Sequence, residues 1–569
     1  MAQTLPQKGH PKGLYVLFAT EMWERFNYYG MRAILVLFMT KALLFDRTFA
    51  SNLYGSYISM LYLSALLGGY VADRYWGNQR SIIAGGIVMA IGEFILFFCG
   101  SVYKSSPHLS SVLFFLGLGM MIAGNGFFKP NISSLVGQLY PKNDHRKDPA
   151  YTIFYMGINI GGALGPFVCG LVGETGNLDD YRWAFLAAGI GMIVSVIIQV
   201  LFHRKYVRDP ENNVLGMVPK NTPKSWLSPT LTVVGLTVLS LAVTGLFYID
   251  TSKFSFLFYL LIACIVIIPA VILADKTLTR EEKNKVIVIF VVCFFVIFFW
   301  GAFEQTGASL VFFADAQTDR YIGLKIPLWV VVMLSALLLY YTITLLKKAS
   351  RNLASDYDKE LRRTVYGLLL LLAAAVVAGV IYLFATGSHY IGKDEIPASW
   401  FQSLNSVFVI VLAPVFAWLW LKLGKRDPSS PTKMAIGLLL LALGYLWIAF
   451  GVKNVQPAVK VSMIWLTGMY LLHTFGELCL SPIGLSLVNK LSPLKFSSLL
   501  MAVWFTANAF GNKLAGVLSS LYPEKGKITS FLGYQMSDSH DFFMLFVFMG
   551  GTAAIVLFFT TWKLQKMMK

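Results

Sequence analysis

One apolar run near the start of the chain carries six side chains that could bind protons or charged ligands. They are Glu21, Glu24, Arg25, Tyr28, Tyr29 and Arg32. Their spacing of i, i+3, i+4, i+7, i+8 and i+11 places them on one face of an α-helix. Carboxylates beside arginines can hold or release a proton as their partners change. An arginine fork also suits a substrate carboxylate.

This polar face cannot contact lipid, so we expect it to line a wet cavity between helices. A purely structural network would explain one ion pair, but it is the weaker explanation for six aligned polar groups. The helix that carries the face, predicted near 13–41, therefore contributes to a central site.

Other charged side chains also lie inside apolar runs, namely Glu93, Glu304, Glu477 and Lys129. A charge in the hydrocarbon layer costs at least ~2.5 to 3.5 kcal/mol, so these residues are candidates for an ion or substrate path. For Glu93, alone in its run, a structural ion pair is an equally good explanation. Lys129 needs a partner, because a bare ammonium group is poorly tolerated there.

The composition is that of a membrane protein. The chain has 569 residues, of which 56% are hydrophobic and 13% charged, with a mean hydropathy of +0.64. Apolar runs of about 20 residues, long enough to cross the bilayer as helices, recur along it. This pattern argues against an outer-membrane barrel, whose strands alternate over about 10 residues. The first apolar run is too charged for a cleavable signal peptide, so we expect the first helix to remain.

We predict an all-α polytopic fold with about sixteen transmembrane helices. The predicted spans are 13–41, 52–73, 81–101, 109–131, 151–172, 183–203, 226–249, 254–275, 286–312, 327–346, 365–386, 399–422, 433–452, 462–487, 497–521 and 542–563. An even number of spans puts both termini on one side of the membrane.

The spans suggest three domains. Residues 1–203 form an N-terminal six-helix bundle, and 204–285 form a linker with two extra helices. Residues 286–569 form a C-terminal six-helix bundle, with a helix pair at 327–386 inserted between core helices 7 and 8. Neither inserted span has a charge in its apolar run, so we interpret both as additions that face lipid.

Basic residues indicate the orientation. Most of the 47 Lys and Arg residues lie in breaks that become cytoplasmic when the N-terminus is inside, as expected for short loops. The few within helices are Arg25, Arg32, Lys129 and Lys513. The net charge of +18 therefore reflects membrane topology. A nucleic-acid partner is the poorer explanation, because the charges form no single stripe.

An enzyme is not indicated. The five cysteines lie inside apolar runs without the paired spacing of a disulfide framework or metal site. The sequence shows no nucleophile with a neighbouring base and no nucleotide-binding loop. We expect no cofactor and no metal.

Several motifs resemble those of the proton-dependent oligopeptide transporter family, within the major facilitator superfamily. The segment Glu21-Met-Trp-Glu-Arg-Phe-Asn-Tyr-Tyr-Gly30 is similar to the first-helix motif of that family. Further similar segments are Gly124–Asn131, Phe154–Gly161, Phe299–Gln305, Phe401–Asn405, Gly476–Gly484 and Trp504–Asn512. The resemblance touches nearly every core helix, and it implies two six-helix halves.

The resemblance also implies roles for particular residues. Arg25 and Lys129 would face a peptide carboxylate, and Glu477, helped by Asn159 and Asn405, would receive the amino terminus. The chamber wall would contain Tyr28, Tyr29, Arg32, Tyr62, Trp300 and Trp504.

Proton coupling would involve Glu21, Glu24, Arg25, Glu304 and Lys129. Glu304 would alternate between pairing with Lys129 and being protonated. The segment Gly69-Tyr-Val-Ala-Asp73-Arg74-Tyr-Trp-Gly77-Asn-Gln-Arg80 resembles a cytoplasmic gate motif of the superfamily. The family usually has 12 core helices, often with two more between the halves, so the pair at 327–386 is a departure.

We therefore expect a proton-coupled symporter that imports di- and tripeptides by alternating access. The proton gradient would drive it, a monomer would be the functional unit, and its place would be the inner membrane of a bacterium with both termini in the cytoplasm. The closest alternative is a carrier of nitrate or another small organic anion from the same family. A peptide-gated channel or receptor and a polytopic membrane enzyme are more distant alternatives.

Overall fold

The computed structural model describes residues 9–141, 144–219, 228–252, 255–330, 390–456, 459–524 and 527–568, with a few isolated residues between 332 and 344. The described part divides into two compact units. One unit combines the residues up to Asp319 with those from Pro397 onward, and the other comprises Arg320–Ile396. The predicted helix pair at 327–386 falls largely outside the described residues.

The smaller unit contains one pair of antiparallel strands among its described residues. Strand β2 (Tyr321–Pro327) pairs with β3 (Tyr390–Glu395), with a register shift between Tyr321 and Leu324. Arg320 donates a hydrogen bond of 2.6 Å from Nη1 to the carbonyl of Ile396, which fixes the two ends of the unit together.

The first half of the larger unit is a bundle of six helices. They are α1 (Lys12–Leu37), α2 (Arg47–Val71), α3 (Gly77–Val102), α4 (Pro107–Gln138), α5 (Lys147–Gly173) and α6 (Tyr181–Tyr206). Helix α1 packs against α5 and α6, while α3 packs against α4 and α6. Each helix coincides with a predicted span. Local signals support the boundaries: the Asp46 side chain, for example, caps α2 by accepting from the backbone amide of Thr48 at 2.9 Å.

Two linker helices follow, α7 (Pro229–Ser252) and α8 (Phe256–Ala274). The second bundle contains α9 (Arg280–Phe303), α10 (Ser309–Ala316), α13 (Phe401–Leu423), α14 (Ser430–Val452), α15 (Met463–Leu491), α16 (Ser497–Ser519) and α17 (Ser539–Met568). A 3-10 turn, Glu304–Gly307, joins α9 to α10, so the predicted span 286–312 is one interrupted helix. Short strands lie in the loops: β1 (Thr318–Asp319) pairs with β4 (Val461–Ser462), and β5 (Thr529–Phe531) with β6 (Tyr534–Met536).

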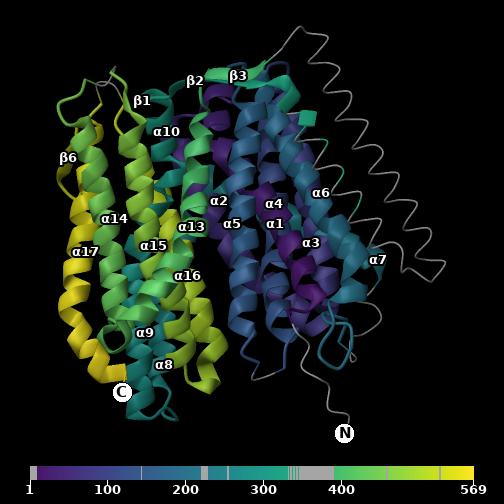
Figure 1. Ribbon diagram of the computed structural model, residues 1–569, viewed down its shortest axis with the longest axis vertical. Coiled ribbons are helices and arrows are strands. Elements are labelled where there is room, and N and C mark those ends of the chain that lie inside the picture. Colours follow the sequence, from purple (N-terminus) through teal and green to yellow (C-terminus); the bar gives the residue numbers. More distant parts are fainter. Residues whose placement is uncertain are drawn as a thin grey trace. The chain divides into compact units, whose positions relative to one another are not determined.

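Eleven helical segments among the described residues are long and apolar enough to cross a membrane, with α2 and α3 forming one continuous segment. The all-α membrane fold that the sequence predicts is confirmed. Helices run alternately up and down (Figure 1). We call the face where α17 ends the terminal side, and the face where α1 ends and α2 begins the far side.

Two helix pairs join the bundles within the larger unit, α2 with α16 and α5 with α13. Close approach occurs at Gly55, where an added Cβ would lie 2.7 Å from the Cα of Gly516. The hydroxyls of Ser51 and Ser519 are 3.2 Å apart, and Ser403 of α13 donates to the carbonyl of Ala163 at 2.8 Å. These contacts lie in the far-side halves of the helices.

Candidate functional site

The polar face of α1 is buried at the centre of the first bundle. Arg25 Nε lies 2.9 Å from Glu21 Oε1 and 2.7 Å from Glu24 Oε2, and all three side chains are at most 3% exposed. Asn125 of α4 donates to the other oxygen of Glu24 at 3.0 Å. One guanidinium group thus balances two carboxylates.

Arg32, two turns further along α1, reaches the second bundle. Its Nη2 lies 3.1 Å from Glu304 Oε2 and donates to the hydroxyl of Thr306 at 3.3 Å. The guanidinium group also lies over the rings of Tyr29 and Tyr54, at 5.4 and 5.9 Å from their centroids. The Arg32–Glu304 ion pair therefore links the bundles at the break between α9 and α10.

Lys129 lies near these charges on α4. Its ammonium group is 4.9 Å from the centroid of the Tyr62 ring, a cation–π contact that holds it beside α2. The charges of Arg25, Glu24 and Glu304 act on it electrostatically. Among the described residues Lys129 makes no ion pair. In this conformation Glu304 pairs with Arg32 instead. The expected alternation of Glu304 with Lys129 stays a prediction.

The second bundle contributes a carboxylate held by an amide. Asn405 Nδ2 donates to Glu477 Oε2 at 2.9 Å and to the hydroxyl of Thr474 at 3.2 Å. Asn159, expected to assist Glu477, instead donates to the carbonyl of Tyr155 in its own helix at 2.9 Å.

Two tryptophans flank this region. Trp300 packs edge-on against Phe303, with centroids 5.3 Å apart, and its buried indole N–H has no hydrogen-bond partner among the described residues. Trp504 is 4% exposed and fills the space beside Gly484, where a Cβ would clash with its ring. Both rings are positioned by packing, as for aromatic side chains in a core.

Among the predicted site residues, Tyr28 lies on the same face as the arginines. Its ring is 5.3 Å from the guanidinium carbon of Arg25 and 5.0 Å from the Tyr29 ring. The structure thus brings Glu21, Glu24, Arg25, Tyr28, Tyr29, Arg32, Tyr62, Lys129 and Glu304 into contact or electrostatic range of one another.

The predicted gate motif lies apart from these residues, on the terminal side between α2 and α3. Gly77 has a φ of +71°, and a Cβ there would meet the carbonyls of Gly216 and Met217, which makes glycine the favoured residue. Arg80 donates to the hydroxyl of Thr232 on α7, and Gly69 lies beside Pro130. Asp73 and Arg74 are exposed. In this structure the motif anchors the linker to the first bundle.

Sequence reasoning missed several polar partners, among them Asn125, Thr306 and Thr474. The signal for Asn125 was present, since an amide between two glycines in an apolar run is unusual. Glu93 has a partner too, because Asn27 of α1 donates to it at 2.9 Å. That contact is a hydrogen bond from a neutral amide inside the first bundle, whereas the structural explanation for Glu93 was an ion pair; no ion pair of Glu93 is found among the described residues.

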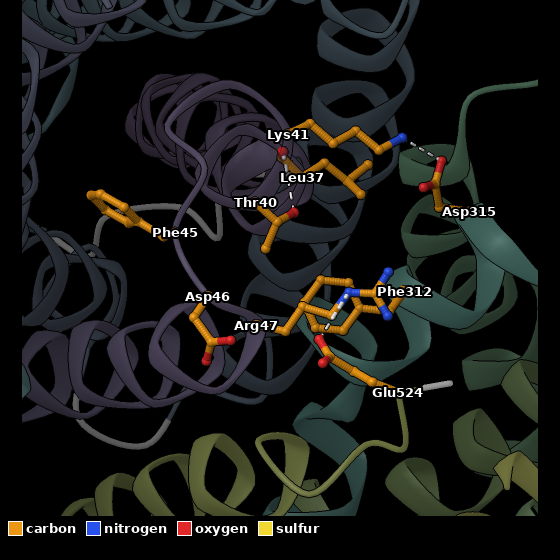
Figure 2. A pocket seen from close by; sticks show the side chains of 9 residues that line it. All are labelled: Leu37, Thr40, Lys41, Phe45, Asp46, Arg47, Phe312, Asp315 and Glu524. Carbon is orange, nitrogen blue, oxygen red and sulfur yellow. Dashed lines mark hydrogen bonds and ion pairs between the residues drawn. The ribbon is translucent and has the colours of Figure 1, made fainter. Parts of the chain in front are cut away.

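The far side carries two further ion pairs between the bundles around a cavity of about 210 Å³. Lys41 Nζ lies 2.7 Å from Asp315 Oδ1, and Arg47 Nε lies 3.9 Å from Glu524 Oε1 (Figure 2). Both cations come from the first bundle and both carboxylates from the second. These partly exposed pairs contribute little stability each, but they meet across the same interface as Arg32 and Glu304.

Helices long and apolar enough to cross a membrane enclose buried charges of both signs, and one ion pair joins the two bundles, as in a secondary transporter. A model of the POT family matches residues 79–389 and 385–531. The chain belongs to this family, and it is a multi-pass membrane protein.

Relatives and solved structures agree over almost the whole length. The uncharacterised transporter YclF of Bacillus subtilis is 32% identical, with 91% of this chain and 90% of that protein covered. The peptide transporter YePEPT of Yersinia enterocolitica is also 32% identical, with 90% and 88% covered. A crystal structure of a peptide transporter of the POT type in complex with sulfate has a TM-score of 0.72 and 28% identity, covering 99% of this chain and 98% of its own.

Proposed function

We propose that this protein is a proton-coupled symporter that carries di- and tripeptides across the membrane by alternating access. The observation that carries the proposal is how the positive and negative side chains are divided between the two bundles. The first bundle offers cations, Arg25 and Lys129, while the second offers the carboxylate of Glu477, held by Asn405. A zwitterionic peptide, with a carboxylate at one end and an ammonium group at the other, complements both.

Cargo selectivity follows from where such a peptide is held. The two charged anchors grip the main-chain termini, so varied side chains are tolerated between them. The named peptide transporters among the relatives, in Yersinia enterocolitica and Lactococcus lactis, support a peptide cargo. A nitrate carrier would leave Glu477 without a positive partner.

Proton coupling requires a carboxylate whose partner changes during the cycle. Glu304 meets this requirement, because its partner Arg32 belongs to the other bundle. A proton on Glu304 would cancel the attraction and let the far side open. Glu21 and Glu24 share Arg25, so a peptide carboxylate that draws Arg25 away would favour protonation of one of them.

The protein would work as a monomer in the inner membrane of a bacterium, with both termini in the cytoplasm and with the proton gradient as its energy source. The far side would then face outward. A membrane potential of 100 mV adds about 2.3 kcal/mol of driving force for each proton.

Purified protein in liposomes with an acidic exterior and an inside-negative potential tests the proposal. Labelled dialanine should accumulate above its external concentration, and unlabelled di- and tripeptides should compete for uptake. Amino acids, nitrate and peptides with blocked termini should not. Accumulation of nitrate with no peptide uptake would establish the alternative cargo, and passive equilibration of peptide would indicate a channel. Recovery of intact dialanine separates a carrier from a peptidase.

A further inference from the structure

The linker hairpin packs on both bundles. Helix α7 contacts α2 and α4, whereas α8 contacts α16 and α9. On the first-bundle side, the ring of Phe247 lies 5.7 Å from that of Phe115 and 6.4 Å from that of Tyr57. On the other side, the ring of Phe258 lies 5.5 Å from that of Phe510. The hairpin therefore spans the interface that separates when a transporter of this type changes state.

A buried ion pair lies at the far-side end of this hairpin. Asp250, near the end of α7, places Oδ2 2.7 Å from the ammonium group of Lys513 on α16. Its Oδ1 accepts from the backbone amide of Leu257 at 2.8 Å, which closes the turn into α8. The Lys513 side chain is 3% exposed and that of Asp250 is not exposed at all.

Lys513 also reaches the first bundle directly. Its Nζ donates to the hydroxyl of Ser56 on α2 at 2.5 Å, and Ser56 is fully buried. One turn away on the same interface, Ser59 donates to the carbonyl of Ala509 at 2.5 Å. Lys513 of the second bundle thus contacts polar groups of α2 and α7, and both of these helices pack on the first bundle.

We propose that Asp250 and Lys513 form an inter-bundle latch that holds the far side closed, with the linker hairpin supplying its carboxylate. This inference rests on the alternating-access part of the proposed function. When α16 separates from α2 and α7 at the far side, the ion pair breaks and both charges enter water. The closed state has two paired charges in a buried setting, where removal of one partner leaves the other uncompensated.

The alternative is that α7 and α16 move together. The ion pair would then only fix the linker hairpin to the second bundle and would not break during the cycle. The packing of Phe247 on Phe115 and Tyr57 argues against it, because it ties the same end of α7 to the first bundle. The two possibilities differ in one measurable quantity, the width of the far side after the pair is broken.

Distance measurements between two spin labels test the latch. The labels are placed at Leu44→Cys, in the loop before α2, and at Leu532→Cys, in the β5–β6 turn, since these side chains are 80% and 94% exposed. The five native cysteines are replaced, and the protein is studied in lipid without peptide or a proton gradient. Asp250→Asn and Lys513→Gln should each raise the population of long distances several-fold. The double variant should raise that population no further than the larger of the two single effects, because both substitutions break the same ion pair.

Lys41→Gln is the matched control, because it breaks a far-side pair whose lysine is 38% exposed, and it should change the distances little. Ser56→Ala keeps both charges but removes the hydroxyl that accepts from Lys513, so it should raise the long-distance population modestly. This variant still tests the latch if Lys513→Gln fails to fold. Unchanged distances in Asp250→Asn and Ser56→Ala would overturn the latch, as would additive effects in the double variant. A wrong cargo assignment would leave these distances unaffected, so the two failures can be told apart.

Discussion

At the scale of single residues, the site depends on which carboxylate each guanidinium group faces. The helical spacing of the α1 motif predicted correctly that its polar groups share one face, because a 3.6-residue period fixes that direction. The partners on other helices could not be predicted from the sequence alone. Arg32 with Glu304 and Glu24 with Asn125 depend on how helices far apart in the chain cross.

Replacement of Glu304 with Gln removes the titratable group at the bundle interface but keeps its size. We expect Glu304→Gln to abolish uphill uptake of dialanine while counterflow into preloaded liposomes continues, because exchange needs no net proton movement. Asp315→Asn, which breaks a far-side pair that is partly exposed, is the matched control and should retain uphill uptake. A Glu304→Gln protein that still concentrates peptide would refute the assignment of proton coupling.

Glu477 is proposed to bind the peptide ammonium group, with Asn405 orienting it. Glu477→Gln removes the charge and should weaken competition by unblocked dipeptide about tenfold or more, since a hydrogen bond to a charged group contributes about 1.5 to 3 kcal/mol. Competition should be measured as half-maximal inhibition of counterflow. Half-maximal inhibition by dialanine that is the same in Glu477→Gln and in the parent protein would refute this role.

At the scale of helices, the sequence predicted the elements well and their ends less well. Apolar runs define the spans because the bilayer requires about 20 residues for each crossing. The predicted span 226–249, however, ends before Ser252 in α7. The error of three residues left Asp250 in a loop, so the carboxylate partner of Lys513 was not recognised. Caps and helix ends are set by local contacts that hydropathy does not encode.

Helix α5 lies against α1 through glycines. A Cβ at Gly165 would be 2.5 Å from the carbonyl of Phe26, so Gly165→Ala forces the two helices apart. We expect a destabilisation of about 1 to 3 kcal/mol, measured as a lower melting temperature in detergent. Gly235→Ala on α7, where a Cβ would meet nothing within 4 Å, should leave it unchanged. Equal melting temperatures for the two variants would show that α5 and α1 adjust without cost.

At the scale of the whole molecule, the sequence predicted two helical halves, but it could not reveal which conformation the halves adopt. That depends on a balance of contacts between distant segments, such as α2 with α16. In this structure those contacts extend from the far side, at Ser51 and Gly55 of α2, to the middle of that helix at Ser59. The inserted pair at 327–386 also remains a prediction.

A crosslink provides a test of the rocking motion. Ser51→Cys with Ser519→Cys, in a protein without native cysteines, should form a disulfide on oxidation, because the parent hydroxyls are 3.2 Å apart. Uptake should be lost on oxidation and return with a reductant. Each single cysteine variant controls for the substitution itself. Uptake that survives complete crosslinking would mean that the far side need not widen at α2 and α16.

The interruption between α9 and α10 also bears on which helices of the second bundle move together. Gln305 bridges the break by donating to the carbonyls of Gly301 and Ala515 at 3.0 and 2.9 Å, so the backbone there is satisfied without a continuous helix. Because Ala515 belongs to α16, this side chain ties the break between α9 and α10 to the helix that meets α2 across the interface. Any motion that parts α16 from α2 would therefore also draw Glu304 away from Arg32.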